Sequence, residues 1–195
     1  MNAKMVVAVV VLFASGCGSD DDTTTTLACI PYPGLERTKP DGDYIIGDPE
    51  SNGLAIGTVS DPNTGLTWSR CSLGQSLASS VAPGGGPCGN PYSISDYTWS
   101  EALAAVRSAN EEGYQEFTDW RLPNVKELST LVDTSCANVT MNTNVFRGVT
   151  RGAYWSSSPN VDSRLEAWGV DFSNGNTMSL TKTDQFAVRL VRGGD

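Results

Sequence analysis

Two stretches near the middle of the chain place apolar residues at helical spacing. The first starts with a capping box, in which the Thr98 oxygen accepts the third amide of the helix and the Glu101 carboxylate returns to the cap amide. Apolar residues then recur every three or four positions until Gly113, a natural stop, so we expect a helix between these points. The apolar positions are Trp99, Ala102, Leu103, Val106 and Ala109.

A second helix is predicted to begin at Asn124. This residue is a good helix cap, and Glu127 stands at the third position, where its carboxylate can bond the cap amide. Pro123 precedes the cap and therefore disrupts no helical hydrogen bond. The stripe expected to be buried consists of Val125, Leu128, Leu131 and Val132.

Before these helices the chain is dominated by loop and turn residues. Residues 30–60 are rich in Pro, Gly and Asp and predict loop with one short edge strand at residues 44–46. Asp61-Pro62-Asn63-Thr64-Gly65 is turn chemistry, because Pro presets φ while Asn and Gly tolerate a positive one. A strand is expected over residues 66–69, with Leu66 and Trp68 on one face.

The last third of the chain changes to a period of two, which predicts strands. We expect a strand at residues 154–157, then a hairpin that turns at Asn174-Gly175, then a closing strand from Phe186 to Arg192. In the hairpin Trp168, Val170 and Phe172 alternate with Ala167, Gly169 and Asp171, and Met178 and Leu180 lie on the return strand. Two helices followed by antiparallel hairpins predict an α+β fold.

The first 28 residues predict export and a lipid anchor. Lys4 leads into an apolar run over residues 5–14, too short for the roughly 20 residues that cross a bilayer. Ala14-Ser15-Gly16 then stands directly before Cys17, which resembles a bacterial lipobox, so residues 1–16 are predicted to be a signal peptide. Cys17 would carry the acyl chains that attach the protein to the membrane. A plain secretory signal with an incidental cysteine is the alternative.

Residues 17–28 continue this picture as a lipidated, flexible linker. They contain the run Asp20-Asp21-Asp22 and then four threonines, and such polar tracts bury too little surface to fold. Gly18 rather than aspartate follows the cysteine, which by resemblance to enteric sorting rules predicts the outer membrane. The remaining residues, 29–195, are expected to form one domain.

Composition excludes several classes of function. The chain of 195 residues has a net charge of −9 and no cluster of Lys and Arg, so it is a poor nucleic-acid binder. It contains no histidine, which removes a Ser-His-Asp triad and any metal held by imidazole. A carboxylate pair that hydrolyses glycosides is the remaining enzymatic alternative. The available acids are Glu116, Asp119, Glu166, Asp171 and Asp184. Because carboxylates at this frequency are normally solvated, we predict no enzyme and no cofactor. Oxygen ligands of the C-terminal part could bind calcium, but no loop has calcium-ligand spacing, so we do not predict calcium or another metal.

Four cysteines remain besides Cys17, and an even number in an exported chain predicts disulfides. Three pairings are possible. We favour Cys71–Cys88, which would close the Gly-rich loop at residues 83–87, together with Cys29–Cys136, which would tie down the start of the domain. A zinc site is the alternative, but the chain has neither a C-x-x-C pair nor a histidine.

Five stretches of the chain resemble, in order, the Lcl C-terminal domain family, named after the C-terminus of a collagen-like bacterial adhesin. They are residues 61–68 (DPNTGLTW), 97–103, 119–128 (DWRLPNVKEL), 154–157 (YWSS) and 188–192 (VRLVR). The resemblance implies a C-type-lectin-like fold with two helices flanking small antiparallel sheets and with chain ends that meet. The Arg-Leu-Pro core is also similar to that of formylglycine-generating enzymes. Their activity needs a cysteine pair in the C-terminal part, whereas this chain has no cysteine after Cys136.

The Trp-Arg-Leu-Pro core of the third stretch is interpreted mainly as scaffold. Trp120 and Leu122 are large apolar residues suited to a core, and Asn124 starts the second helix. Arg121 needs a partner beside so much apolar surface. The alternatives are Glu127, Asp119 and backbone carbonyls.

Ligand binding is the function that we predict, on the face that such folds build from variable loops. That face is expected to come from residues 142–152 and the C-terminal hairpins. Its candidate ligand-binding residues are Asn160, Arg164, Trp168, Asp171, Asn174, Asn176 and Lys182. Amides, charged groups and an aromatic ring suit a glycan, and a surface protein is the other expected ligand. The alternatives are an ordinary polar hairpin and a structural component of an envelope assembly. The family's adhesin is similar to a sulfated-polysaccharide binder, but this chain shows no basic cluster for sulfate.

Overall fold

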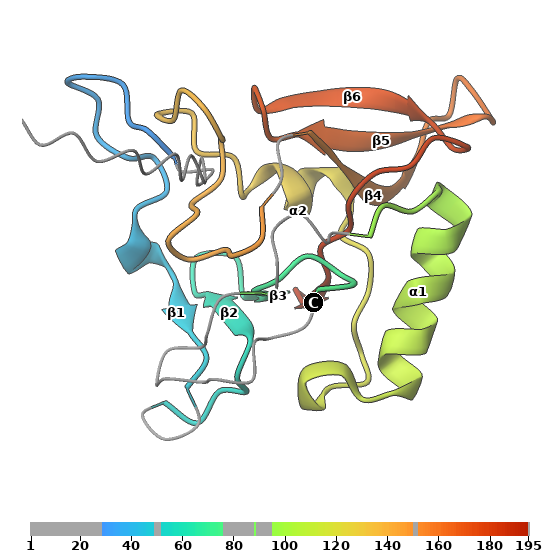
Figure 1. Ribbon diagram of the computed structural model, residues 1–195, viewed down its shortest axis with the longest axis horizontal. Helices are drawn as coiled ribbons and strands as arrows, with labels where there is room; N and C mark the ends of the chain where they lie inside the picture. The colour runs from blue at the N-terminus through green and yellow to red at the C-terminus, as the bar shows by residue number, and fades with distance from the viewer. Residues whose placement is uncertain (1–28, 49–51, 76–87, 89–94, 150–151, 195) are drawn as a thin grey trace, which may run out of the picture.

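The computed structural model describes residues 29–48, 52–75, 88, 95–149 and 152–194 (Figure 1). The predicted signal peptide, the predicted lipidation site Cys17, the predicted linker and the Gly-rich loop at residues 83–87 lie outside the described residues. Among the helices of the described ranges, none has the length and apolar character needed to cross a bilayer.

Two antiparallel sheets and two α-helices form the domain, which confirms the predicted α+β class. The first sheet has the order β1-β2-β3-β7 and the second the order β4-β5-β6. Their strands are β1 (Ile45–Ile46), β2 (Thr58–Asp61), β3 (Leu66–Ser69), β4 (Ala153–Pro159), β5 (Glu166–Asp171), β6 (Asn176–Thr181) and β7 (Val191–Gly193). The last strand pairs with β3, so the end of the domain returns to its beginning.

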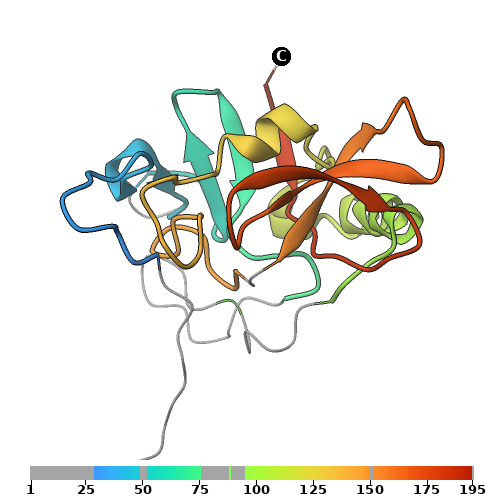
Figure 2. The ribbon, with the colours of Figure 1, turned by 90° about the horizontal axis from the view of Figure 1, so that it is seen from above.

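The helices begin where their sequences predict. α1 (Trp99–Glu111) and α2 (Val125–Ser129) each start with a complete capping box, formed by Thr98 with Glu101 and by Asn124 with Glu127. Short 3-10 turns occupy Asp41–Asp43 and Tyr114–Glu116. α2 lies between the two sheets in both views and contacts β4 and β5, whereas α1 contacts β4 (Figures 1 and 2).

The core consists of two apolar clusters. The first includes Leu128 of α2 and Leu131, which follows the helix. Trp68 of β3 and Val170 of β5 belong to the same cluster. The second includes Ala102 and Val106 of α1 together with the remaining large residues of the scaffold core and β4. Those residues are Trp120, Leu122 and Trp155. β5 contributes Val170 to the first cluster and Ala167 to the second, so both of its faces are covered.

This double covering explains why Trp168 does not share the burial of Val170 and Phe172, with which it recurs at every second position. An alternating strand is expected to bury one face, but β5 buries Ala167 and Gly169 as well as Val170, and leaves Trp168 only half-buried. Because the period-two argument assumes one solvated face, it cannot distinguish the two sides of a central strand.

The predicted closing strand is also shorter than its alternation indicates. Phe186 and Ala187 form single bridges, and a regular strand appears only at Val191–Gly193. Between them Val188 and Leu190 accept hydrogen bonds from Leu73 and Ser69. Every side chain from residue 187 to residue 191 is buried, since the segment runs through the interior between elements on both sides.

The β5–β6 hairpin turns over four residues instead of the two expected at Asn174-Gly175. The Asp171 carbonyl accepts the amides of both Asn174 and Gly175, and Gly175 has a positive φ of 80°. The β2–β3 turn repeats this geometry: the Asp61 carbonyl accepts two amides and Gly65 has a φ of 70°. In each of the two hairpins, a type I turn followed by a left-handed glycine therefore connects the two strands.

Both predicted disulfides are present. Cys29–Cys136 joins the first described residue to the loop after α2, and Cys71–Cys88 follows the end of β3. Residues 29–48 are further attached by the pairing of β1 with β2 and by Tyr44, which packs edge-on against Phe146. This segment precedes the family motifs and lies along one side of the first sheet (Figure 1).

Candidate functional site

The seven residues predicted to bind a ligand do not lie at one place. Asp171, Asn174 and Asn176 lie at the β5–β6 turn, whereas Asn160, Arg164 and Lys182 lie at the opposite end of the same hairpin. β5 contains six residues, and at about 3.3 Å per residue the two groups are about 16 Å apart. Trp168 lies between them. A single small ligand therefore cannot contact all seven.

The three residues at the turn use their side chains to hold the backbone. The Asp171 carboxylate accepts the Ser173 amide at 2.8 Å and the Asn174 side-chain amide at 3.2 Å. The Asn174 oxygen accepts the Asn176 amide at 2.8 Å. Such local bonds are the ordinary reason for Asp and Asn in turns, so this group is structural in the described fold.

The other end of the hairpin is held in the same way. Asn160 donates to Glu166 and to Ser179, at 3.2 and 2.8 Å. The Lys182 ammonium donates to the Arg164 carbonyl at 2.9 Å and lies 4.5 Å from the centre of the Trp99 ring. Among the three candidate residues at this end of the hairpin, only Arg164 has an exposed side chain that does not hold the local structure.

The described part of the loop at residues 142–152, residues 142–149, is mostly buried and exposes Asn144 and Arg147. Asn142 is fully buried and donates to the Lys39 carbonyl and the Asp41 carboxylate, at 3.0 and 2.8 Å. Val145 and Phe146 belong to the core. The apolar residues of this loop therefore turn inward, where Phe146 packs edge-on against Tyr44, and its contribution to a ligand-binding face stays a prediction.

A concave feature lies elsewhere, in an open groove of about 560 Å³ between α1 and α2. Three of its residues come from one face of α1, and the other five come from the scaffold core, the start of α2 and β4. They are Leu103, Val106, Arg107, Arg121, Leu122, Asn124, Glu127 and Ser157. We call this the α1–α2 groove.

Capping geometry fixes one wall of the groove. The Glu127 carboxylate accepts the Asn124 amide at 2.7 Å, and the same carboxylate binds Arg121 through two contacts of 2.7 Å each. Arg121 also donates to the Gly193 carbonyl at 2.8 Å. Burial alone would raise the pKa of Glu127, but the hydrogen bonds from Arg121 and Asn124 outweigh it and hold the pKa below its ordinary value. Glu127 is therefore an ionised structural partner.

The opposite wall carries a cation that is not used by the fold. Arg107 is exposed on α1, and in the described ranges it forms no ion pair. Leu122 and Val106 are buried between the walls, and Asn124 and Ser157 add an amide and a hydroxyl. The groove thus combines an apolar floor with a guanidinium and neutral polar groups at its rim, which is the usual composition of a small-ligand site.

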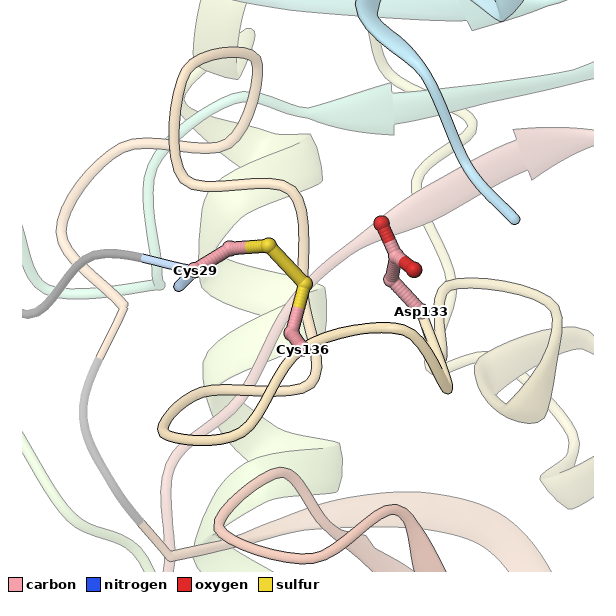
Figure 3. Close-up of side chains that lie close together, drawn as sticks. All are labelled: Cys29, Asp133 and Cys136. Carbon is pink, nitrogen blue, oxygen red and sulfur yellow. A yellow bond between two sulfur atoms is a disulfide. The ribbon is translucent and has the colours of Figure 1, made fainter. Parts of the chain in front are cut away.

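One cluster has the composition of a metal site, at Cys29, Asp133 and Cys136, whose ligand atoms lie within 4.8 Å of one another (Figure 3). The two cysteines form a disulfide and offer no thiolate. The Asp133 carboxylate accepts hydrogen bonds from Arg37, Thr38 and Ser135. Burial would raise its pKa, but these hydrogen bonds outweigh burial and lower it. These bonds explain the charge of Asp133 without an ion.

Sequence reasoning missed the α1–α2 groove although it named most of the motifs that line it. Leu103 and Arg107 are four residues apart on α1 and so share a face, which was a usable signal. The position of Leu122 and Ser157 across from them depends on long-range packing. The interpretation of the Trp-Arg-Leu-Pro core as scaffold agrees with burial of Trp120 and Leu122. Two of the three alternatives for the Arg121 partner are present, Glu127 and a backbone carbonyl, that of Gly193.

A family model described as the Lcl C-terminal domain matches residues 57–192, which is most of the chain. No curated protein matches the sequence. All residues that line the α1–α2 groove fall inside the matched range, whereas the segment fastened by Cys29 precedes it.

Proposed function

Because the chain belongs to the Lcl C-terminal domain family, we propose that it is a non-catalytic binding module displayed at the cell envelope on a lipid anchor. The α1–α2 groove is its ligand site, and a glycan is the ligand. The observation that carries the proposal is the pairing of an unused guanidinium, Arg107, with an apolar floor in a concave site of about 560 Å³.

The dimensions and chemistry of the groove suit one or two sugar rings. A pyranose ring has an apolar face that packs on aliphatic side chains such as Leu103 and Leu122, while its hydroxyls need donors and acceptors at the rim. Asn124 and Ser157 supply an amide and a hydroxyl there. Arg107 adds a fixed positive charge, so a sugar that carries a carboxylate would gain a charge-assisted hydrogen bond.

The lining of the groove supports binding without catalysis. Glycoside hydrolysis uses two carboxyl groups on opposite sides of the scissile bond. Glu127 is the one acid among the lining residues, and its oxygens are occupied by Arg121 and the Asn124 amide. The absence of histidine from the sequence removes the commonest general base.

Localisation at the envelope is supported by the sequence of the first 17 residues. A short apolar run followed by Ala14-Ser15-Gly16 and Cys17 matches the signal of a bacterial lipoprotein. The two disulfides agree with folding in an oxidising compartment. We propose the outer membrane as the destination.

The test is a glycan array probed with the full chain and two arginine variants. Arg107→Ala removes the free cation of the groove, and Arg164→Ala removes an equally exposed cation from the β4–β5 loop. We expect Arg107→Ala to weaken binding about tenfold, the effect of one charge-assisted hydrogen bond, with unchanged circular dichroism and melting temperature. Arg164→Ala should bind like the original chain.

Three results of this array contradict the proposal. Binding lost with Arg164→Ala and kept with Arg107→Ala would return the site to the hairpin. No binding to any glycan by the full chain would reject the glycan as ligand. Time-dependent cleavage of a bound glycan would reject the non-catalytic role. A pull-down of envelope proteins with the same two variants then tests a protein ligand.

A further inference from the structure

The strand β6 leaves one edge of the second sheet open. In the order β4-β5-β6 it is an outer strand, and it is seen at the top of Figure 1 with no described segment beyond it. In the described ranges no backbone hydrogen bond links residues 176–181 to any strand other than β5. Four of its six side chains are exposed.

The open edge also lacks the usual protection against strand addition. Natural edge strands are commonly short, or carry Lys, Pro or a bulge that prevents pairing with another chain. β6 has the sequence Asn-Thr-Met-Ser-Leu-Thr, with no charge and no proline, and it pairs with β5 in regular register over all six residues. Its exposed apolar residue is Met178, at 39%. Such an edge is suited to binding another strand.

The hydrogen-bond pattern shows which groups face outward. The Lys182 amide donates to the Leu165 carbonyl, directly after the end of β6. In an antiparallel pair this direction alternates, so Leu180 and Met178 also direct their amides and carbonyls toward β5. The backbone groups of Thr177 and Ser179 and the Thr181 amide therefore point to the open edge, while the Thr181 carbonyl already accepts the Asp184 amide at 2.9 Å.

From this arrangement we propose that β6 pairs antiparallel with β6 of a second copy, around a two-fold axis at Ser179. The two three-stranded sheets then become one continuous sheet of six strands. This inference is independent of the α1–α2 groove, because no lining residue of the groove lies on β6.

The register around Ser179 is self-complementary. It places Ser179 opposite Ser179 of the second copy and Thr177 opposite Thr181, and all of these residues have outward backbone groups. On the other face, Met178 lies opposite Leu180 of the second copy, so each exposed methionine gains an apolar neighbour. Thr–Thr and apolar pairs are favourable cross-strand neighbours, and no like charges meet.

The absence of charge on β6 makes this edge the place where a second copy can pair despite the acidic surface. Two copies of a chain with net charge −9 repel each other over most of their surfaces. β6 is a stretch of six consecutive uncharged residues, so two copies can approach there without opposing carboxylates. A cationic partner would instead be attracted to the acidic surfaces and would gain nothing from a neutral edge.

Disulfide trapping tests the predicted axis. In a hydrogen-bonded antiparallel pair opposing Cα atoms are about 5.5 Å apart, within the range of about 4.4–6.8 Å that a disulfide accepts. Ser179→Cys in the full chain should therefore form a covalent dimer on mild oxidation, seen on a non-reducing gel. Thr183→Cys is the matched control, because residue 183 is exposed just beyond the strand. It should remain monomeric.

Sedimentation velocity of the full chain, without introduced cysteines, gives a second readout. The original chain should shift from monomer to dimer as its concentration rises, and Met178→Lys should weaken that association about tenfold. Thr183→Lys adds the same charge outside the strand and should leave association unchanged. Circular dichroism of each variant shows that the fold is retained.

Several outcomes overturn the inference. A monomer at every concentration together with no dimer from Ser179→Cys rejects the second copy. Equal trapping by Ser179→Cys and Thr183→Cys shows random collision instead of a defined axis. A covalent product between Ser179→Cys and a different protein shows that the edge serves another partner. Unchanged association in Met178→Lys places any dimer contact elsewhere.

Discussion

Arg121 and Glu127 are joined by a two-pronged ion pair, with both nitrogen–oxygen distances at 2.7 Å. The same carboxylate caps α2 by accepting the Asn124 amide, and the same guanidinium donates to the carbonyl of Gly193, the last residue of β7. One pair of side chains therefore connects the start of the second helix to the last strand. It also forms one wall of the α1–α2 groove.

Replacing the guanidinium should destabilise the whole domain. Arg121→Met keeps the aliphatic stem but leaves the half-buried Glu127 carboxylate without its partner. We expect the free energy of unfolding to fall by about 1–2 kcal/mol, a modest loss because the arginine side chain is 39% exposed and partly screened by water. Urea unfolding measures it. Arg107→Met is the control and should change stability little, so equal losses in both variants would contradict this account.

Acid should unfold the domain through carboxylates whose pKa lies below the ordinary value. Glu127 and Asp133 both have lowered pKa values, because hydrogen bonds outweigh the effect of burial. Their contribution is therefore complete above the unfolded-state pKa of about 4 and is lost as pH falls through the lower folded-state values. Asp133→Asn should make the dependence of stability on pH below about 4 shallower, as measured by urea midpoints from neutral pH to about pH 2. An unchanged acid slope would exclude Asp133 as a contributor.

The two disulfides should differ in their contribution to stability. Cys29–Cys136 spans 107 residues and Cys71–Cys88 spans 17. On the chain-entropy account, removing them costs about 5 and about 3 kcal/mol. Paired alanine substitutions, compared by thermal unfolding, test the order. A larger loss from Cys71→Ala with Cys88→Ala would show that local packing dominates over loop length.

The lipid anchor should depend on Cys17 alone. Cys17→Ala should move the protein from the membrane fraction to the soluble fraction, since no other cysteine is available for acylation. Mass spectrometry of the mature chain should show a start at Cys17 and an added mass from acyl chains. Gly18→Ala is the control and should stay in the membrane. Retention of residues 1–16 in the mature protein would contradict export by this signal.

Local signals in the sequence predict the helices and the hairpins well. Thr98 with Glu101, and Asn124 with Glu127, form their capping boxes within four residues, so nothing distant is needed to make them. The two disulfides were predicted from loop chemistry and position, and the structure has the same pairs.

The candidate site required information that no local pattern contains. Arg107 and Leu122 line one groove because α1 and the scaffold core fold against the same strand, β4. The seven candidate ligand-binding residues in and beside the C-terminal hairpin gave a stronger sequence signal. Most of them serve the turn or the loop in which they lie, as Asp171 does for the Ser173 amide. Turn chemistry and ligand chemistry use the same residue types, and only the three-dimensional arrangement separates them.

β3 has β2 on one side and β7 on the other, so the family region starts and stops within a single sheet. A domain whose two ends lie side by side can be inserted into another chain without disturbing its core. Residues 29–48 lie outside this region and are attached to it by the Cys29–Cys136 disulfide. Residues 29–48 and the residues before them can therefore change in evolution while the region that matches the family stays the same.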